Sequence, residues 1–342
     1  MARAVVLGCA GPALGADEAA FLREADPLGF ILFARNCESP AQVRALVTAL
    51  RESVGRAEAP VLIDQEGGRV ARLRPPHWRA APAAACFGDL AATDPDRAAR
   101  AAWINARLIA ADLADLGITV NCAPVLDLAR PETHAVIGDR ALAGDPETVA
   151  ALGRAVCAGL LAGGVLPVAK HLPGHGRARV DSHAALPIIE ADAETLAGSD
   201  FVPFTALAEA APWAMTAHAV YTALDPDRPA TLSPGVIAGT LRERIGFSGV
   251  LISDDLSMKA LSGDLATRAA EALAAGCDLV LHCNGDRAEM AAVVAGCAEV
   301  TPAARARLDR AEAARRAAVD ALAEADRAAL GQELEARLDR DR

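Results

Sequence analysis

Short apolar runs recur along the chain and alternate with longer segments in which apolar and polar residues follow a helical period. The short runs are rich in Val, Ile and Leu without strict alternation, as expected for strands buried on both faces. They cover residues 4–9, 29–34, 59–64, 117–122, 164–171, 212–218, 248–254 and 276–283. The longer segments predict helices over residues 17–26, 40–55, 95–116, 145–162, 192–210, 233–244, 263–275 and 286–299.

Eight strands that alternate with eight helices predict an α/β fold, a single (β/α)8 barrel of the TIM type. An open, doubly wound sheet is the alternative that the same alternation allows. Asp17, Ser39 and Ser233 stand where helix N-caps are expected. We assign residues 1–300 to the barrel. Residues 301–342, rich in Ala, Arg, Glu and Asp, form a predicted C-terminal helical extension packed on it.

Polar side chains stand at or near the ends of six of the eight predicted strands. They are Asp64, Asn121, Lys170 with His171, His218, Asp254 and His282. The carboxyl ends of barrel strands form one face, and barrel enzymes hold their active sites there. The pattern therefore predicts an enzyme, although it does not indicate which reaction the enzyme catalyses.

The composition narrows the possible partners and location. With 53% hydrophobic and 23% charged residues in 342, the chain can bury a large core. A net charge of −11 argues against nucleic acid as a partner, and no window approaches the ~20 apolar residues of a membrane span. The eight cysteines form no CxxC pair, and the apolar stretch before Cys9 is too short for a signal-peptide core. We expect a cytoplasmic monomer with reduced thiols, without a nucleic-acid or membrane partner.

The segment KHLPGHGRARVDSH, residues 170–183, holds three of the seven histidines. His171 and His175 are four residues apart, which on a helix would suit a metal ion. A Pro-Gly pair lies between them, so a helix is not expected there, and no Glu or Cys cluster completes a ligand set. We therefore expect no metal and no cofactor. Lys170 and His171 are instead predicted to end a strand and to point into the mouth of the barrel.

Two further segments supply titratable groups. In Asp181-Ser-His183 the carboxylate can orient the imidazole and stabilise its cationic form, although a solvated loop pair without chemistry is the alternative. Asp254 and Asp255 follow a buried strand and should point to different sides. Asp254 is then the candidate carboxylate in the mouth, and Asp255 is expected to cap the next turn.

A third segment favours a sugar as the ligand. In IDQEGGRVARL, residues 63–73, Asp64 ends a strand and Arg72 follows a Gly pair. IGDRAL, residues 137–142, contributes Arg140. The Gly pair lacks the Lys and Ser/Thr of a phosphate-binding loop. An Asp that can bond two hydroxyls, with Arg nearby, suits a carbohydrate.

Together these segments resemble the bacterial β-N-acetylhexosaminidases of glycoside hydrolase family 3, the NagZ type. The resemblance covers about residues 4–300 and rests on IDQEGGRVARL, NCAPVLDL, IGDRAL, KHLPGHGRARVDSH, MTAHAVY and ISDDLSMKA, in that order. It implies that Asp254 is the nucleophile of a retaining glycosidase and that His183 and Asp181 form its acid/base pair. The substrate-binding residues implied by the resemblance are Asp64, Arg72, Arg140, Lys170 and His171.

The implied chemistry agrees with elementary requirements. A retaining glycosidase needs a carboxylate nucleophile and a separate proton donor close to it. Histidine changes its charge near neutral pH without burial, so it can take the place of the second carboxyl group. A donor carried on a loop allows the motion of that loop to limit turnover.

Three functions are compatible with these residues. The first is removal of terminal β-linked GlcNAc from a small sugar substrate, such as the GlcNAc-1,6-anhydroMurNAc peptides of cytosolic cell-wall recycling. The second is phosphorolysis of the same glycosides, because a histidine repels phosphate less than a carboxylate does. The third is a non-catalytic sugar-binding barrel, which the presence of both Asp254 and His183 argues against.

Overall fold

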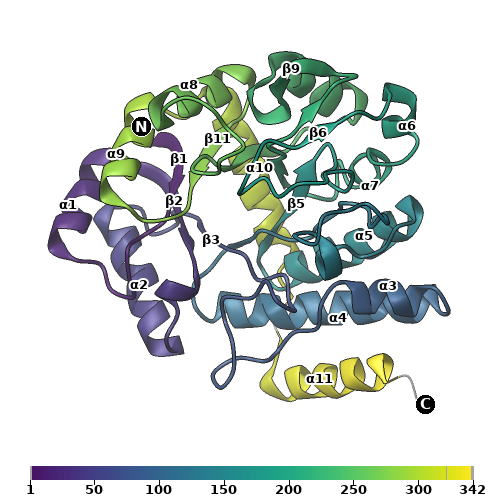
Figure 1. Ribbon diagram of the computed structural model, residues 1–342. Coiled ribbons are helices and arrows are strands. Elements are labelled where there is room, and N and C mark those ends of the chain that lie inside the picture. The colour runs from purple at the N-terminus through teal and green to yellow at the C-terminus, as the bar shows by residue number, and fades with distance from the viewer. Residues whose placement is uncertain (1, 321, 340–342) are drawn as a thin grey trace.

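The computed structural model describes residues 2–320 and 322–339, and this part of the chain contains a closed barrel of eight parallel strands (Figure 1). Around the barrel the strand order is β1-β11-β10-β7-β5-β4-β3-β2. The strands are β1 (Arg3–Leu7), β2 (Pro27–Leu32), β3 (Val61–Ile63), β4 (Val120–Asn121), β5 (Leu166–Leu172), β7 (Trp213–Thr216), β10 (Val250–Asp255) and β11 (Leu279–His282). The predicted (β/α)8 barrel is confirmed, and its closure rules out the open sheet.

Seven of the eight predicted helices are present, with ends that differ from the prediction by a few residues. They are α1 (Ala16–Ala25), α2 (Pro40–Ser53), α4 (Pro95–Ala114), α5 (Pro146–Ala162), the π-helix η4 (Val236–Arg244), α8 (Leu265–Ala275) and α9 (Arg287–Gly296). The eighth, predicted over 192–210, is instead two short helices, α6 (Ala193–Ala197) and α7 (Val202–Ala206), since the chain leaves the first helix at Gly198.

Two of the three predicted helix caps are confirmed. The Ser39 hydroxyl accepts the N–H of Gln42 at the start of α2, and the Ser233 hydroxyl accepts the N–H of Val236 at the start of η4. The prediction for Asp17 is wrong, because α1 begins one residue before it and Asp17 lies in the first turn. There its carboxylate still faces the positive end of the helix dipole.

Several elements were not predicted. They are α3 (Ala85–Ala91), the short helices η1 (Ala34–Asn36), η2 (Gly138–Arg140) and η3 (Ala230–Leu232), and a small sheet of β6 (Ile188–Ile189), β8 (Val220–Tyr221) and β9 (Asp225–Pro229). Most are only two or three residues long, too short for an apolar period to reveal them. Among the described residues no helix has both the length and the apolar character needed to cross a membrane.

Alternation along each strand divides the core into two layers. On β3, Leu62 belongs to the cluster inside the barrel, whereas Val61 and Ile63 belong to the cluster between strands and helices. The same division holds on β1, where Val6 points inward and Val5 points to the helices. Because both faces of each strand are covered, the apolar runs show no simple hydrophobic–polar alternation.

Helix α10 (Pro302–Ala318) lies across the amino-terminal end of the barrel, and Figure 1 shows it behind the strands. Its residues Ala304, Leu308 and Ala311 join the apolar cluster of the barrel interior. Helix α11 (Glu324–Leu338) packs on α4, where Arg100 pairs with Glu333. Since α10 covers one end of the barrel, access to its interior is confined to the carboxyl ends of the strands.

The packing of α10 can be tested by truncating Leu308, which is 9% exposed. Leu308→Ala should lower the free energy of unfolding by about 2–4 kcal/mol, because it opens a void under the barrel. Val319→Ala is the control, since Val319 is 51% exposed and its truncation should cost less than about 0.5 kcal/mol. Equal losses for the two variants in denaturant titrations would show that α10 is not part of the core.

Candidate active site

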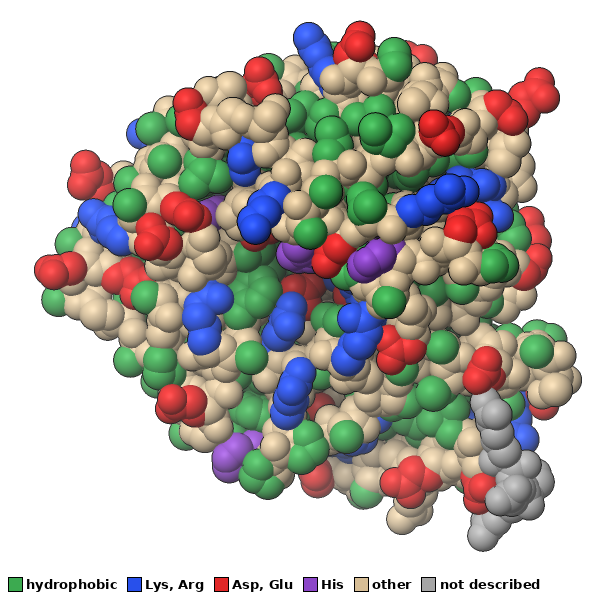
Figure 2. Space-filling view, in the orientation of Figure 1, with side chains coloured by type: hydrophobic (Ala, Val, Ile, Leu, Met, Phe, Trp, Pro, Cys, Tyr) green, Lys and Arg blue, Asp and Glu red, His purple; other side chains and the backbone are tan. Residues whose placement is uncertain are grey.

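The carboxyl ends of the strands surround a cavity of about 250 Å³. Figure 2 shows it as a hollow in this face, with acidic and histidine side chains inside and Lys and Arg side chains around it. Seven of the eight predicted site residues line the cavity, namely Asp64, Arg72, Arg140, Lys170, His171, His183 and Asp254. The eighth, Asp181, contacts His183. The fold therefore brings together residues from positions 64 to 254.

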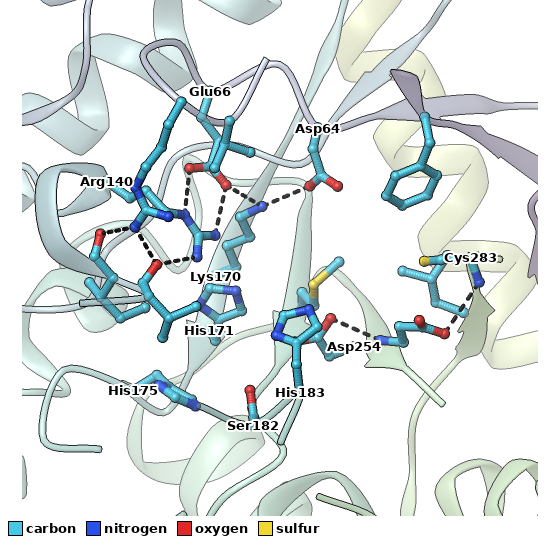
Figure 3. A pocket seen from close by; sticks show the side chains of 18 of the residues that line it. Asp64, Glu66, Arg140, Lys170, His171, His175, Ser182, His183, Asp254 and Cys283 are labelled. Atoms are coloured by element: carbon cyan, nitrogen blue, oxygen red, sulfur yellow. Dashed lines mark hydrogen bonds and ion pairs between the residues drawn. The ribbon is translucent and has the colours of Figure 1, made fainter. Parts of the chain in front are cut away.

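An ion-pair network forms one wall of the cavity (Figure 3). The Lys170 ammonium lies 2.9 Å from Asp64 Oδ1 and 2.7 Å from Glu66 Oε1. Arg140 binds both oxygens of Glu66, at 2.9 and 2.8 Å. Arg72 donates to Asp64 Oδ2 at 3.1 Å. We call these five residues the clamp.

Charge pairing keeps the clamp ionised although it is largely buried. Burial raises the pKa of the Asp64 and Glu66 carboxyls, but the Lys170 ammonium and the adjacent guanidinium groups outweigh it, so both pKa values fall below normal. Burial lowers the pKa of Lys170, and the two carboxylates more than reverse this. At neutral pH the clamp thus offers fixed charged donors and acceptors, which form the strongest hydrogen bonds to hydroxyls.

His171 is held by a buried carboxylate that the sequence did not single out. Its Nδ1 lies 2.7 Å from Asp127 Oδ2, and its backbone N–H donates to Asp127 Oδ1. The backbone N–H of His175 donates to the same oxygen at 2.6 Å. Burial raises the pKa of Asp127, but the His171 imidazole and these hydrogen bonds lower it to about 2. Asp127 is therefore an anion at neutral pH, and it orients the His171 ring toward the cavity.

Asp254, at the end of β10, is half-buried and faces the cavity. Its Oδ1 accepts the backbone N–H of Asp255 at 2.8 Å. Burial raises the pKa of the carboxyl, but the His171 and His218 imidazoles and this hydrogen bond outweigh it, so the pKa is lowered. Asp254 is thus ionised at neutral pH and available to attack a carbon centre.

Asp255 differs in part from its prediction. It does cap the next turn, since its Oδ1 accepts the N–H of Ser257 and its Oδ2 the Ser257 hydroxyl. Contrary to the prediction, it also lines the cavity, because its Oδ1 reaches across to the backbone N–H of Cys283. Its carboxylate is occupied by these donors, whereas that of Asp254 is not held by any side-chain donor in the described chain.

His183 reaches the cavity from an exposed loop. Its Nδ1 lies 2.8 Å from Asp181 Oδ1, and 68% of its side chain is exposed. Burial raises the pKa of the Asp181 carboxyl, but the hydrogen bonds from the backbone and ring of His183 and the nearby imidazoles together outweigh it, so the pKa is lowered. An ionised Asp181 fixes the proton on Nδ1 and leaves Nε2 of His183 to exchange a proton with a ligand.

The loop that carries this pair has a fixed base and an exposed tip. Tyr221 donates to the carbonyl of Gly174 at 2.8 Å, Thr133 to that of Gly176 at 2.6 Å, and Arg177 to Asp200 at 2.7 Å. A Cβ on Gly176 would lie 2.2 Å from the Leu128 carbonyl oxygen, so only glycine fits. Residues 179–186 are mostly exposed.

Three other strand-end residues do not line the cavity. Asn121 bonds the backbone of Gln65 behind the wall, and His218 donates to the Asp255 carbonyl. The expectation for His282 is wrong. Because neighbouring strand residues point to opposite sides, Leu281 and Cys283 line the cavity, while His282 faces Glu289 on α9.

Sequence reasoning assigned no place in the site to Glu66, Asp127, Arg69 or Ser182, and it considered His175 only as a metal ligand. Glu66 stands two residues beyond Asp64, a spacing that puts both on one side of an extended chain and could have revealed it. His175 lines the cavity, burial lowers its pKa to about 4, and neither ring nitrogen has a partner in the described chain. It is a neutral imidazole whose two ring nitrogens are buried in the wall of the cavity.

The His171–His175 pair lies on a strand and loop, as predicted, and not on a helix. Within residues 2–320 and 322–339 there is no group of three or more His, Cys, Asp or Glu placed to hold a metal ion.

Comparisons with known proteins agree on one family. Residues 10–316 match the glycosyl hydrolase family 3 N-terminal domain. A β-hexosaminidase of Pseudomonas aeruginosa is 41% identical over 309 residues, 89% of this chain and 90% of that protein. A β-hexosaminidase of Methylococcus capsulatus is 42% identical over 277 residues, 80% of each chain.

Solved structures give the same result. NagZ from Neisseria gonorrhoeae, in complex with N-trifluoroacetyl-D-glucosamine, superposes with a TM-score of 0.86 at 31% identity, over 98% of each chain. A family 3 β-N-acetylglucosaminidase from Paenibacillus superposes with a TM-score of 0.83 at 32% identity, over 98% of this chain and 67% of that one.

The clamp predicts a large effect of Glu66→Gln. The amide keeps the shape but leaves Arg140 and Lys170 without their shared anion, so we expect a loss of about 3 kcal/mol in unfolding free energy. The kcat/KM for a glycoside should fall about 10²-fold, the equivalent of one lost charged hydrogen bond. Asp139→Asn is the control, because its pair with Arg69 is exposed and should cost under about 1 kcal/mol. Similar results for both would contradict the clamp.

Asp127 predicts a pH-dependent contribution to stability. Its folded pKa of about 2 lies below the unfolded value, so its contribution is present above about pH 4 and is lost as pH falls toward 2. Asp127→Asn should therefore lower the unfolding free energy by about 2 kcal/mol at pH 7, and this difference should shrink in acid. Denaturant titrations between pH 3 and 7 measure it. A difference that stays constant across this range would refute the stabilisation of the Asp127 carboxylate by His171 and the backbone N–H groups.

Proposed function

The chain belongs to glycosyl hydrolase family 3 and is a glycoside hydrolase of the β-hexosaminidase type, and we propose that its substrates are GlcNAc-1,6-anhydroMurNAc peptides. In this proposal it removes the terminal non-reducing β-linked GlcNAc with retention of configuration. The observation that carries the mechanism is one cavity lined by an unoccupied carboxylate, Asp254, and by His183 with its partner Asp181.

The size and lining of the cavity suit one sugar ring, which we propose is the terminal sugar of the substrate. The clamp and His171 provide charged groups for hydroxyls, and Met215 and Leu281 add apolar surface suited to an N-acyl methyl group. The gonococcal relative was solved with an N-acylglucosamine. We infer that the same type of sugar binds here between the clamp and Asp254.

Two displacement steps account for the reaction. Asp254 attacks the anomeric carbon while His183 protonates the glycosidic oxygen, so that the aglycone leaves as an alcohol and a glycosyl-enzyme forms. His183, now neutral, then removes a proton from water, and the resulting hydroxide displaces Asp254. Asp181 stabilises the imidazolium in the first step and keeps the Nδ1 proton in place in both.

Hydrolysis is favoured over phosphorolysis, because the relatives described above carry the names of hydrolases. The deciding experiment incubates the protein with a GlcNAc-anhydroMurNAc peptide in phosphate buffer and in a phosphate-free buffer. We expect free GlcNAc at equal rates in both buffers. Formation of GlcNAc 1-phosphate would overturn hydrolysis, and no release of GlcNAc in either buffer would overturn the substrate.

We further propose a cytoplasmic, monomeric enzyme. All eight cysteines are free, and six of them are buried, as expected in a reducing compartment. Size-exclusion chromatography with light scattering tests the monomer, and cell fractionation tests the location.

The role of His183 can be separated from simple binding with a series of leaving groups. General acid catalysis is typically worth ~10²–10⁴-fold and matters most for poor leaving groups. His183→Ala should therefore nearly abolish cleavage of a sugar aglycone but slow glycosyl-enzyme formation from a nitrophenyl glycoside much less. Because the second step also loses its base, a burst of nitrophenol should appear. Asp181→Asn should follow the same trend more mildly.

The outcome that contradicts this assignment is an equal loss for every leaving group without a burst. His183 would then bind the substrate or shape the loop, and the proton donor would lie elsewhere.

A further inference from the structure

Two exposed cations flank the acid/base pair. Arg179 lies two residues before Asp181, and Lys259 lies five residues after Asp254. Across residues 2–320 and 322–339, neither side chain forms a hydrogen bond or an ion pair. The sequence contains only two lysines, and the second, Lys170, is the centre of the clamp.

The cations that line the cavity are, in contrast, already paired with carboxylates. Arg72 pairs with Asp64, Arg140 with Glu66, Lys170 with both, and Arg69 with Asp139. They cannot give their full charge to an anionic ligand without giving up these partners. Recognition of a negative group beside the acid/base pair therefore falls to Arg179 and Lys259.

The two segments that carry these cations meet at the mouth of the cavity. The backbone N–H of Ala260, next to Lys259, donates to the carbonyl of Ser182 at 3.1 Å. Ser182 and His183 line the cavity together with Asp254. Figure 2 shows Lys and Arg side chains around the hollow.

We propose that Arg179 and Lys259 form an anion-binding edge of the aglycone subsite and bind a carboxylate of the leaving group. The inference rests on the proposed function, in which His183 contacts the glycosidic oxygen, so the leaving group lies on the side of the scissile bond nearest the two cations. With a net charge of −11 the protein repels an anionic substrate at a distance. Two local cations offset that repulsion where the substrate binds.

The test compares two substrates that differ only in charge: a GlcNAc-β-1,4-anhydroMurNAc peptide with a free carboxyl terminus and no other charged group, and the same peptide with a neutral methylamide in place of that carboxylate. The readout is the ratio of kcat/KM for the acid to that for the amide. Arg179→Gln and Lys259→Gln should each lower this ratio about threefold, and the double variant about tenfold, as expected for exposed charge pairs. The effect should decrease as salt is added. Arg23→Gln, which removes an exposed cation from α1, should leave the ratio at the wild-type value.

The possible outcomes distinguish a failure of the anion-binding edge from a failure of the proposed function. If wild type releases GlcNAc from both substrates but the double variant keeps the wild-type ratio, the anion-binding edge is wrong and the hydrolase assignment stands. If wild type hydrolyses neither substrate, the proposed function is wrong and the inference falls with it. Hydrolysis of the methylamide shows in the same experiment that each variant is folded.

Acylation of Lys259 provides an independent test. Succinic anhydride converts an exposed ammonium into a carboxylate, whereas Lys170 is shielded by burial and by two carboxylates. Succinylation of wild type should lower the ratio more than Lys259→Gln does, because it reverses the charge. Treated Lys259→Gln, which has lost its exposed lysine, should match the untreated variant. An unchanged ratio in succinylated wild type would overturn the role of Lys259.

Discussion

The Lys170 ammonium, buried between the carboxylates of Asp64 and Glu66, connects the end of β5 to the segment that follows β3. Because β4 lies between β3 and β5, this contact links two strands that are not neighbours in the barrel, at the end where the cavity lies. Its geometry then determines where Arg72 and Arg140 lie, because each guanidinium follows one of the two carboxylates. A buried ion pair is stable only when every member is compensated. The clamp therefore behaves as one unit, and the loss of any member leaves an uncompensated charge against the sugar.

The site combines this rigid clamp with a proton donor on an exposed loop. Asp127 holds both His171 and the start of the loop, and Tyr221, Thr133 and Asp200 fix the loop as far as residue 178. Beyond that point Asp181 and His183 hold mainly one another. The sugar ring must pass His183 when it enters and leaves the cavity. The proton donor therefore has to lie on an exposed loop, since a fully packed donor would block access. The exposed part also carries Arg179, so recognition of the aglycone and delivery of the proton share one segment.

Much of the fold and the site could be predicted because the relevant signals are local. Buried parallel strands give uninterrupted apolar runs, and each run that ends in a polar residue marks the active face. Asp127 could not be found this way, because it follows β4 by six residues and its role depends on His171, which is 44 residues away. The direction of His282 was open to prediction, because it follows from alternation along its own strand. The break between α6 and α7, by contrast, depends on packing against neighbouring elements. Periodicity along one segment does not contain that information.

The central claim is that Asp254 is the nucleophile and Asp255 is not, although the two are adjacent and both line the cavity. A slow fluoro-sugar substrate with a good leaving group traps the glycosyl-enzyme, and mass spectrometry of the digested protein identifies the modified residue. The account predicts one sugar per chain, attached to Asp254, since the carboxylate of Asp255 is held by Ser257 and by the backbone N–H of Cys283. A label on Asp255, or turnover without any covalent intermediate, would contradict it.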